Sequence, residues 1–86
     1  MNEVINEKVS VVLVYDRQKN NVMPYRLRWQ GRDFKITKLG FHHKYRLGRT
    51  IQHIFSVTDG NTFFRLRLDT DTLQWTLEEI SDGITA

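Results

Sequence analysis

The chain has 86 residues, of which 40% are hydrophobic, so it can build one domain but is too short for two separate cores. It contains no cysteine, which excludes a disulfide scaffold, a thiolate metal site and a cysteine nucleophile. No apolar run approaches the roughly 20 residues of a membrane-spanning helix, and the net charge of +3 is divided unevenly along the chain.

The composition predicts one domain built from strands. Valine, isoleucine, threonine and the aromatic residues account for 31 of the 86 residues, and the single alanine is Ala86. β-branched and aromatic side chains favour the pleated, half-buried surface of a sheet. We therefore expect a single all-β domain over residues 1–86, with an ordered core at about residues 8–80. The first residues show no signal-peptide pattern, so we expect a cytoplasmic protein.

The first predicted strand is the nearly continuous apolar run Lys8–Tyr15. Apolar side chains at odd and even positions indicate a strand that is buried on both faces, and a monomer this small can cover only one of them. The polar stretch Asp16–Asn21 predicts a loop. Pro24 precedes the next strand, where a missing N–H does little harm.

A hairpin is predicted around Gly31. Tyr25–Trp29 alternates strictly, and Gly31-Arg32 suits a type II′ turn, which has glycine at its first central position. Like charges directly opposite each other are destabilising, so a cationic pair in this hairpin hints at a nearby anion. The predicted register pairs Trp29 with Phe34, Leu27 with Ile36 and, on the other face, Arg28 with Lys35.

The alternation changes parity after Ile36, because the next apolar positions are odd-numbered. A parity change requires a bulge or a bend, and Gly40 lies beside it. We expect a long, bent strand that turns the corner of a small barrel. Its odd positions are Leu39, Phe41, His43, Tyr45 and Leu47.

Two turns organise the second half of the chain. Asp59-Gly60 suits a type I′ turn, and Asp69–Thr72 suits a four-residue loop. Both turns put the apolar residues of three strands on one face, which predicts a small antiparallel barrel or roll of five or six strands with a frayed tail at Ser81–Ala86. The first turn pairs Phe55 with Phe64, His53 with Leu66 and Ile51 with Leu68, and the second pairs Leu68 with Leu73, Leu66 with Trp75 and Phe64 with Leu77. The predicted core contains Trp29, Phe34, Phe55, Phe64, Leu66, Trp75 and Leu77.

The charges form a basic middle between acidic ends. Residues 17–67 carry twelve Lys and Arg against two acids, a sum of +10, whereas residues 1–16 sum to −2 and residues 68–86 to −5. Such asymmetry is typical of a surface that binds a polyanion. The alternative is a solubilising surface that the protein's own acids balance.

The predicted registers place cations around an exposed aromatic ring, that of Phe63. In proteins that bind single-stranded nucleic acid, phosphates meet the cations while a base stacks on the ring, worth ~1–3 kcal/mol per base. The alternative is an ordinary ion pair of Glu78 with Arg65, and burial of Phe63 under the N-terminal strand. The predicted nucleic-acid-binding residues are Arg26, Arg28, Lys35, Lys44, Arg46, Phe63, Arg65 and Arg67, and the last five are expected on one face.

Metal binding and catalysis are not predicted. His43 and His53 are expected on the apolar face, and two histidines fall short of the three or four ligands of a metal site. Asp69 and Asp71 lie in a predicted turn, where aspartate is favoured for its local backbone hydrogen bonds. No Gly-x-Ser-x-Gly motif or glycine-rich phosphate loop is present. We therefore expect no catalytic residue, no metal and no cofactor.

Two segments, Pro24–Phe34 and Leu73–Asp82, carry a resemblance. The first contains Pro-x-Arg-x-x-Trp-x-Gly-Arg and the second a Trp-x-Leu strand, and together they resemble a family of small uncharacterised bacterial all-β domains over about residues 24–82. The resemblance implies no activity and no residue role. Association of some members of that family with DNA-repair polymerases favours a nucleic-acid partner.

The sequence therefore predicts a small basic domain that binds nucleic acid, single-stranded and without strong sequence preference. The alternative function is a module for protein interaction or homo-oligomerisation, in which Val9–Tyr15 pairs across a symmetric dimer. No membrane partner and no small-molecule substrate are expected, because 86 residues leave little room for a ligand cavity.

Overall fold

The computed structural model describes residues 2–82, which form one antiparallel sheet of seven strands in the order β3-β2-β1-β7-β6-β5-β4. The all-β prediction is confirmed. The strands of this part of the chain outnumber the predicted five or six, and their sheet does not close into a barrel. No helix that could span a membrane occurs in the described part. The strands are β1 (Asn2–Asp16), β2 (Asn21–Trp29), β3 (Arg32–Lys35), β4 (Lys38–Leu47), β5 (Thr50–Thr58), β6 (Thr62–Asp69) and β7 (Trp75–Asp82).

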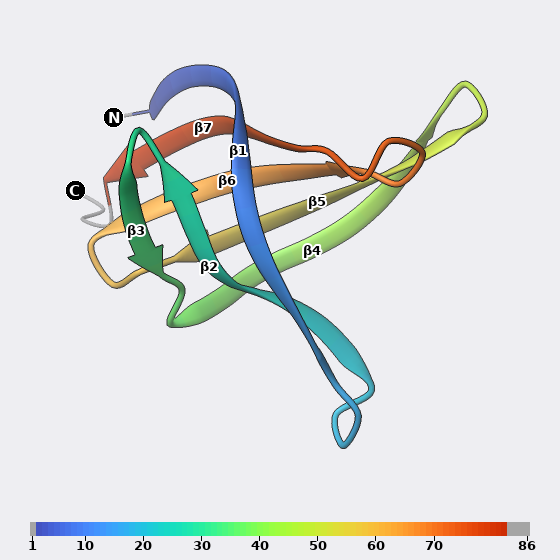
Figure 1. The fold of residues 1–86 in the computed structure, drawn as a ribbon, viewed down its shortest axis with the longest axis horizontal. Coiled ribbons are helices and arrows are strands. Elements are labelled where there is room, and N and C mark those ends of the chain that lie inside the picture. Colours follow the sequence, from blue (N-terminus) through green and yellow to red (C-terminus); the bar gives the residue numbers. More distant parts are fainter. Residues whose placement is uncertain (1, 83–86) are drawn as a thin grey trace.

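β1 links two layers of this sheet. Its first part, as far as Val9, pairs with β7, and the part from Ser10 to Asp16 pairs with β2. In Figure 1, β1, β2 and β3 cross in front of β4–β7 at a steep angle. We call Ser10–Asp16 with β2 and β3 the wing, and β4–β7 the main sheet. Strands that pass from one layer to the other through a bend are typical of such orthogonal packing.

The core lies between the inner faces of the wing and the main sheet. Leu27 of β2 is completely buried, as are Phe55 and Leu66 of the main sheet. The predicted common core is confirmed, with Trp29 and Phe34 half-buried at its border. The buried members of the cluster are Leu27, Ile36, Phe55, Val57, Phe64, Leu66, Trp75 and Leu77.

The β2–β3 turn differs from the prediction by one residue. Gln30 and Gly31 are its central residues, with φ of 53° and 74°. Two positive φ values are required by a type I′ turn, which matches the twist of the two strands. As a consequence, Lys35 lies opposite Arg26, and the predicted Arg28–Lys35 pair is wrong because Arg28 faces Asp33.

The other two hairpins are shifted by two residues from the predicted registers. Phe55 lies opposite Leu66 rather than Phe64, and Leu66 lies opposite Leu77 rather than Trp75. The loops are longer than predicted because the Asp59 and Asp69 carboxylates each accept two backbone N–H groups of the residues that follow. A shift of two preserves the side-chain alternation, so the core faces are as predicted.

The predicted bulge at Gly40 is present, but it reverses the predicted faces of β4. Leu39 lies opposite Val57 on the inner face, and the register shifts before Phe41. After this shift His42 lies opposite Phe55, so even-numbered residues face inward and Phe41 and its odd-numbered successors face outward. The parity therefore changes twice, once between Ile36 and Leu39 and again at Gly40.

The predicted frayed tail is partly corrected. Ser81 and Asp82 belong to β7 and pair with Phe63 and Thr62 of β6. The remainder of that prediction, residues 83–86, lies outside the described residues.

We expect Phe64→Ala to destabilise the fold by about 3–5 kcal/mol, because it removes a side chain that is 1% exposed at the centre of the core. Phe63→Ala is the matched control, since the neighbouring ring is 38% exposed on the outer face, and it should cost about 1 kcal/mol or less. Denaturant unfolding of both variants measures the difference. Equal losses would contradict the assigned faces.

Candidate nucleic-acid interface

The eight predicted binding residues lie on three surfaces. Arg26, Arg28 and Lys35 lie on the outer face of the wing, because their neighbours Leu27 and Phe34 point into the core. The prediction that the last five residues share one face is wrong, because the second parity change at Gly40 turns β4 over. Lys44 and Arg46 lie on the inner face of β4, and Phe63, Arg65 and Arg67 lie on the outer face of the main sheet.

The two arginines of the main sheet have an internal counter-ion. Arg65 Nε donates a hydrogen bond to Glu78 Oε1 at 3.0 Å, and Arg67 Nη1 donates to Glu78 Oε2 at 3.1 Å. Glu78 occupies the extra position of a bulge in β7, which directs its carboxylate towards β6. The ion pair that the sequence offered as an alternative is therefore present, and it neutralises part of this surface.

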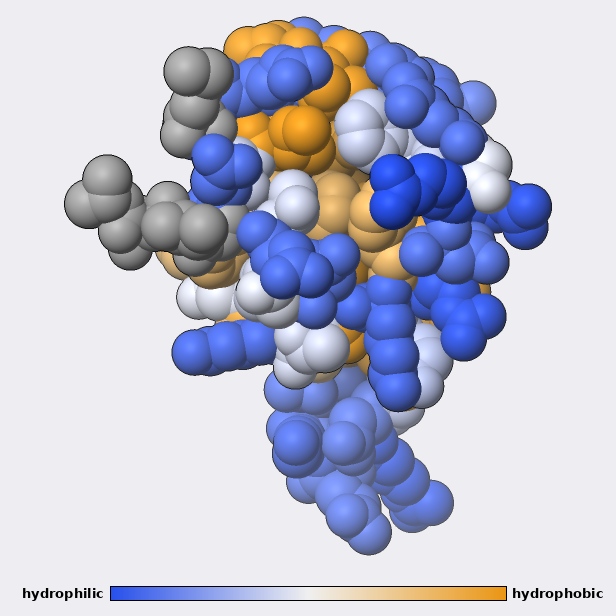
Figure 2. All heavy atoms as spheres, turned by 90° about the vertical axis from the view of Figure 1, so that its left-hand side faces the viewer, coloured by the Kyte–Doolittle hydropathy of each residue, from blue (hydrophilic) through white to orange (hydrophobic). Residues whose placement is uncertain are grey.

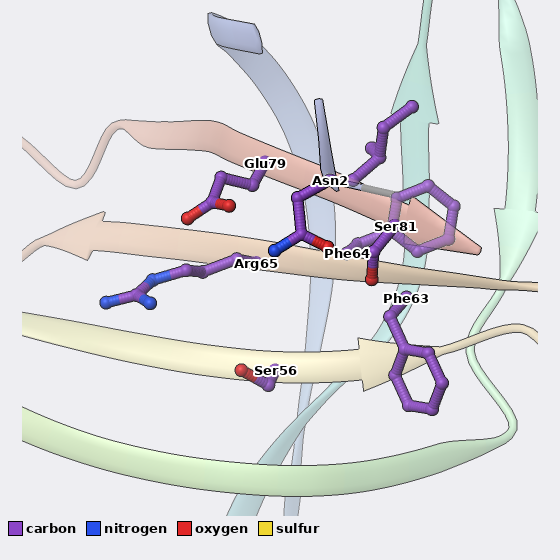
Figure 3. A pocket seen from close by; sticks show the side chains of 8 residues that line it. Asn2, Ser56, Phe63, Phe64, Arg65, Glu79 and Ser81 are labelled. Carbon is purple, nitrogen blue, oxygen red and sulfur yellow. The ribbon is translucent and has the colours of Figure 1, made fainter. Parts of the chain in front are cut away.

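Phe63 and Arg65 line a shallow hollow of about 280 Å³ on the outer face of the main sheet. Figure 3 shows the Arg65 guanidinium directed away from the Phe63 ring, with Ser56 between them on β5. Phe63 is 38% exposed, so the N-terminal strand does not bury it. Glu79 lines the same hollow, which therefore offers no excess of positive charge.

The outer face of the wing carries cations that form no ion pair with any described residue. Arg26 lies directly opposite Lys35, and Arg28 lies opposite Asp33. Within residues 2–82, no carboxylate oxygen lies within 4.0 Å of any of these three cations. Two like charges across a strand pair reduce stability, so this surface favours an anion from outside the chain.

Tyr25 adds an aromatic side chain to the wing that the sequence analysis missed. Val12 pairs with Arg26 while Leu13 pairs with Pro24, so Tyr25 is the extra residue of a bulge, which the strict alternation of Tyr25–Trp29 did not predict. It is 42% exposed and lines a hollow of about 140 Å³ together with Val14 and Met23. Proline is enriched at bulges because it cannot donate a ladder hydrogen bond, so Pro24 was the available signal.

The inner face of β4 carries His42 together with Lys44 and Arg46, and His53 of β5 lies beside them. The His42 ring stacks on Phe55 with 4.1 Å between centroids and 8° between planes, and its Nε2 lies 2.9 Å from Nδ1 of His53. Lys44 lies opposite His53. The hydrogen bond between the two rings requires one nitrogen to donate and the other to accept, so it excludes the doubly protonated pair.

Burial and positive neighbours lower the histidine pKa values. For His42, desolvation acts first, followed by the charges of His53, His43 and Lys44, and together they lower its pKa below the ordinary 6.5. For His53, desolvation and then Lys44 lower the pKa below the same value. Both rings are therefore mainly neutral at pH 7.

Five of the seven predicted cations point to one side of the molecule. The inner face of the main sheet looks towards the wing, and the outer face of the wing looks away from the main sheet, so both faces point in the same direction (Figure 1). Lys44 and Arg46 therefore share a side with the wing cations, and Arg65 and Arg67 lie on the opposite side. The end of the β1–β2 hairpin projects downwards in Figure 1. In Figure 2, this projecting end is coloured hydrophilic.

No group of three or more His, Asp or Glu side chains within residues 2–82 is arranged to hold a metal ion.

No family model matches the chain, and no curated protein or solved structure is significantly similar to it.

We expect the stability of the fold to decrease as the pH falls below 6.5. The lowered pKa values of His42 and His53 mean that the unfolded chain takes up protons first, so protonation below 6.5 favours unfolding until the folded-state values are reached. Denaturant midpoints between neutral and mildly acidic pH measure this loss. The double variant His42→Gln/His53→Gln is the control, and an equally steep loss in that variant would contradict the assignment.

Proposed function

We propose that the protein binds single-stranded nucleic acid, without strong sequence preference, on the outer face of the wing. Arg26, Arg28 and Lys35 contact phosphates, and the exposed ring of Tyr25 stacks on a base. The observation that carries the proposal is a set of cations with no carboxylate partner among the described residues, beside an exposed aromatic ring.

Electrostatics support a polyanion as the ligand. The Arg26–Lys35 cross-strand pair is a cost in the free protein, and a phosphate between the two side chains converts that cost into attraction. Lys44 and Arg46 point to the same side from β4 and extend the positive field beyond the wing.

A single strand fits this surface better than a duplex. Val12 lies opposite Arg26 and is 51% exposed, so apolar and aromatic groups lie among the cations. A single strand can lay unpaired bases on such groups while its phosphates meet the charges, whereas a duplex keeps its bases stacked inside. In the proposed function, the protein binds nucleic acid in the cytoplasm and does not catalyse a reaction.

A protein-interaction module is the alternative function. The observation that favours it is the exposure of Tyr15 and Val14, which are 60% and 43% accessible on β1. A partner protein would bury these side chains without using the cations of the wing.

We expect binding to a fluorescent oligothymidylate to weaken steeply with salt. With three to five phosphate contacts and a slope of about −0.7 per contact, raising the salt from about 50 to about 200 mM should reduce affinity about 20- to 130-fold. Arg26→Ala should make the slope shallower by about 0.7 because one contact is lost. Fluorescence anisotropy titrations at several salt concentrations provide both values.

Tyr25→Ala should weaken binding by ~1–3 kcal/mol and leave the salt slope unchanged, because stacking releases no counter-ion. Arg65→Ala and Phe63→Ala are matched controls on the opposite side of the molecule. Arg65→Ala should change the salt slope by no more than about a third of the change in Arg26→Ala, and Phe63→Ala should lose no more than about a third of the affinity that Tyr25→Ala loses. No binding at low salt by folded protein would refute the proposed function. A larger effect of Arg65→Ala than of Arg26→Ala would move the site to the main sheet.

A further inference from the structure

Among residues 2–82, the second half of β1 has one edge without a strand partner. β1 pairs with β7 only as far as Val9, and beyond that point its single strand partner among residues 2–82 is β2. Leu73 and Gln74 line a hollow together with Lys8–Val11 of β1. The segment Val12–Asp16 therefore presents one edge of its backbone to solvent.

This edge lacks the protection that the two outer strands of the sheet carry. β3 is four residues long and three of them are charged, and β4 carries the Gly40 bulge together with Lys38, Lys44 and Arg46. Short, charged or bulged edges prevent pairing with other chains. In contrast, Val12–Tyr15 is free of charge and of proline, and all four side chains are at least 39% exposed.

The end of the β1–β2 hairpin has too few strands to be stable by itself. From Leu13 and Pro24 to the turn it is a ribbon of two strands, because β3 pairs only with Arg26–Trp29. A two-stranded ribbon in water is marginally stable, and further strands are needed to stabilise it. A strand added to the free edge of β1 supplies that stability.

We propose that the added strand is β1 of a second copy of this chain, which pairs antiparallel through Val12–Asp16. An antiparallel strand related by a two-fold axis sets apolar residues opposite apolar residues, and Asp16 lies opposite Val12 or Ser10 of the second copy rather than its own carboxylate. The pairing therefore covers the apolar residues Val12–Tyr15 without setting the two Asp16 carboxylates opposite each other. The product is a six-stranded sheet of order β3-β2-β1-β1-β2-β3.

Such a dimer has a geometric consequence for the wing. A two-fold axis perpendicular to the joined sheet keeps both outer faces on the same side, so the cations of the two wings form one continuous surface. The dimer itself does not rest on the proposed function, since it uses the edge and not the cations. Its assembly is therefore measured without nucleic acid.

Sedimentation equilibrium at micromolar concentration should show a dimer of the full chain. Val14→Glu should raise the dissociation constant about tenfold or more, because it places a carboxylate of each copy within the short apolar pair of strands. Leu47→Glu is the matched control, since Leu47 is 61% exposed at the end of β4, and it should leave the dimer intact. A monomeric wild-type protein, or a dimer that Val14→Glu does not weaken, would overturn the proposal.

Single cysteine variants keep the test decisive if Val14→Glu unfolds the hairpin. The chain has no cysteine, so every disulfide reports the introduced residue. Mild oxidation of Val12→Cys, Leu13→Cys, Val14→Cys and Tyr15→Cys should crosslink most at one central position and less on either side, because only residues near the two-fold axis meet their own copies. Leu47→Cys should not crosslink. Equal or absent crosslinking along Val12–Tyr15 would overturn the proposed pairing.

Discussion

The packing of the wing on the main sheet is the interaction on which the other features of the structure depend. β1 passes from one layer to the other, and Phe34 of β3 reaches Phe64 of β6 with 5.1 Å between ring centroids. At the border of this contact, Trp29 Nε1 donates a hydrogen bond to Glu7 Oε1 at 3.3 Å. Once these inner faces are buried, side-chain alternation determines which residues of every strand remain available to a partner.

The fold class and most of the core could be predicted from the sequence because they depend on parity alone. The predicted register of Phe55 and Phe64 was displaced by two residues, yet both rings still point into the core. The exact loops could not be predicted, because the Asp59 and Asp69 carboxylates extend each loop beyond its shortest form.

The candidate site was less predictable, because single-residue bulges decide it. Gly40 reverses the faces of β4 and carries Lys44 and Arg46 away from Arg65. A bulge beside Pro24 leaves Tyr25 exposed beside Arg26, and a third bulge brings Glu78 to the main-sheet arginines. Each bulge flips every following side chain, so an error of one residue relocates an entire charged surface.

Counter-ions separate the two sides of the molecule. On the outer face of the main sheet, one carboxylate holds two guanidinium groups, and this surface is largely satisfied within the chain. On the wing, within the described residues, Arg26 and Lys35 face each other with no such partner. The wing therefore has the uncompensated positive charge that would attract an external anion most strongly. Two wings joined in a dimer would double the number of these cations.

The most direct measurement is an NMR titration of the ¹⁵N-labelled protein with an oligothymidylate of about 12 nucleotides, a length within the site size of small single-strand binders. The account predicts that amide shifts change along β2 and β3 and at the inner positions of β4, and that Phe63 and Arg65 remain unperturbed. Perturbations centred on Phe63 and Arg65, or a spectrum that does not change at low salt, would contradict it.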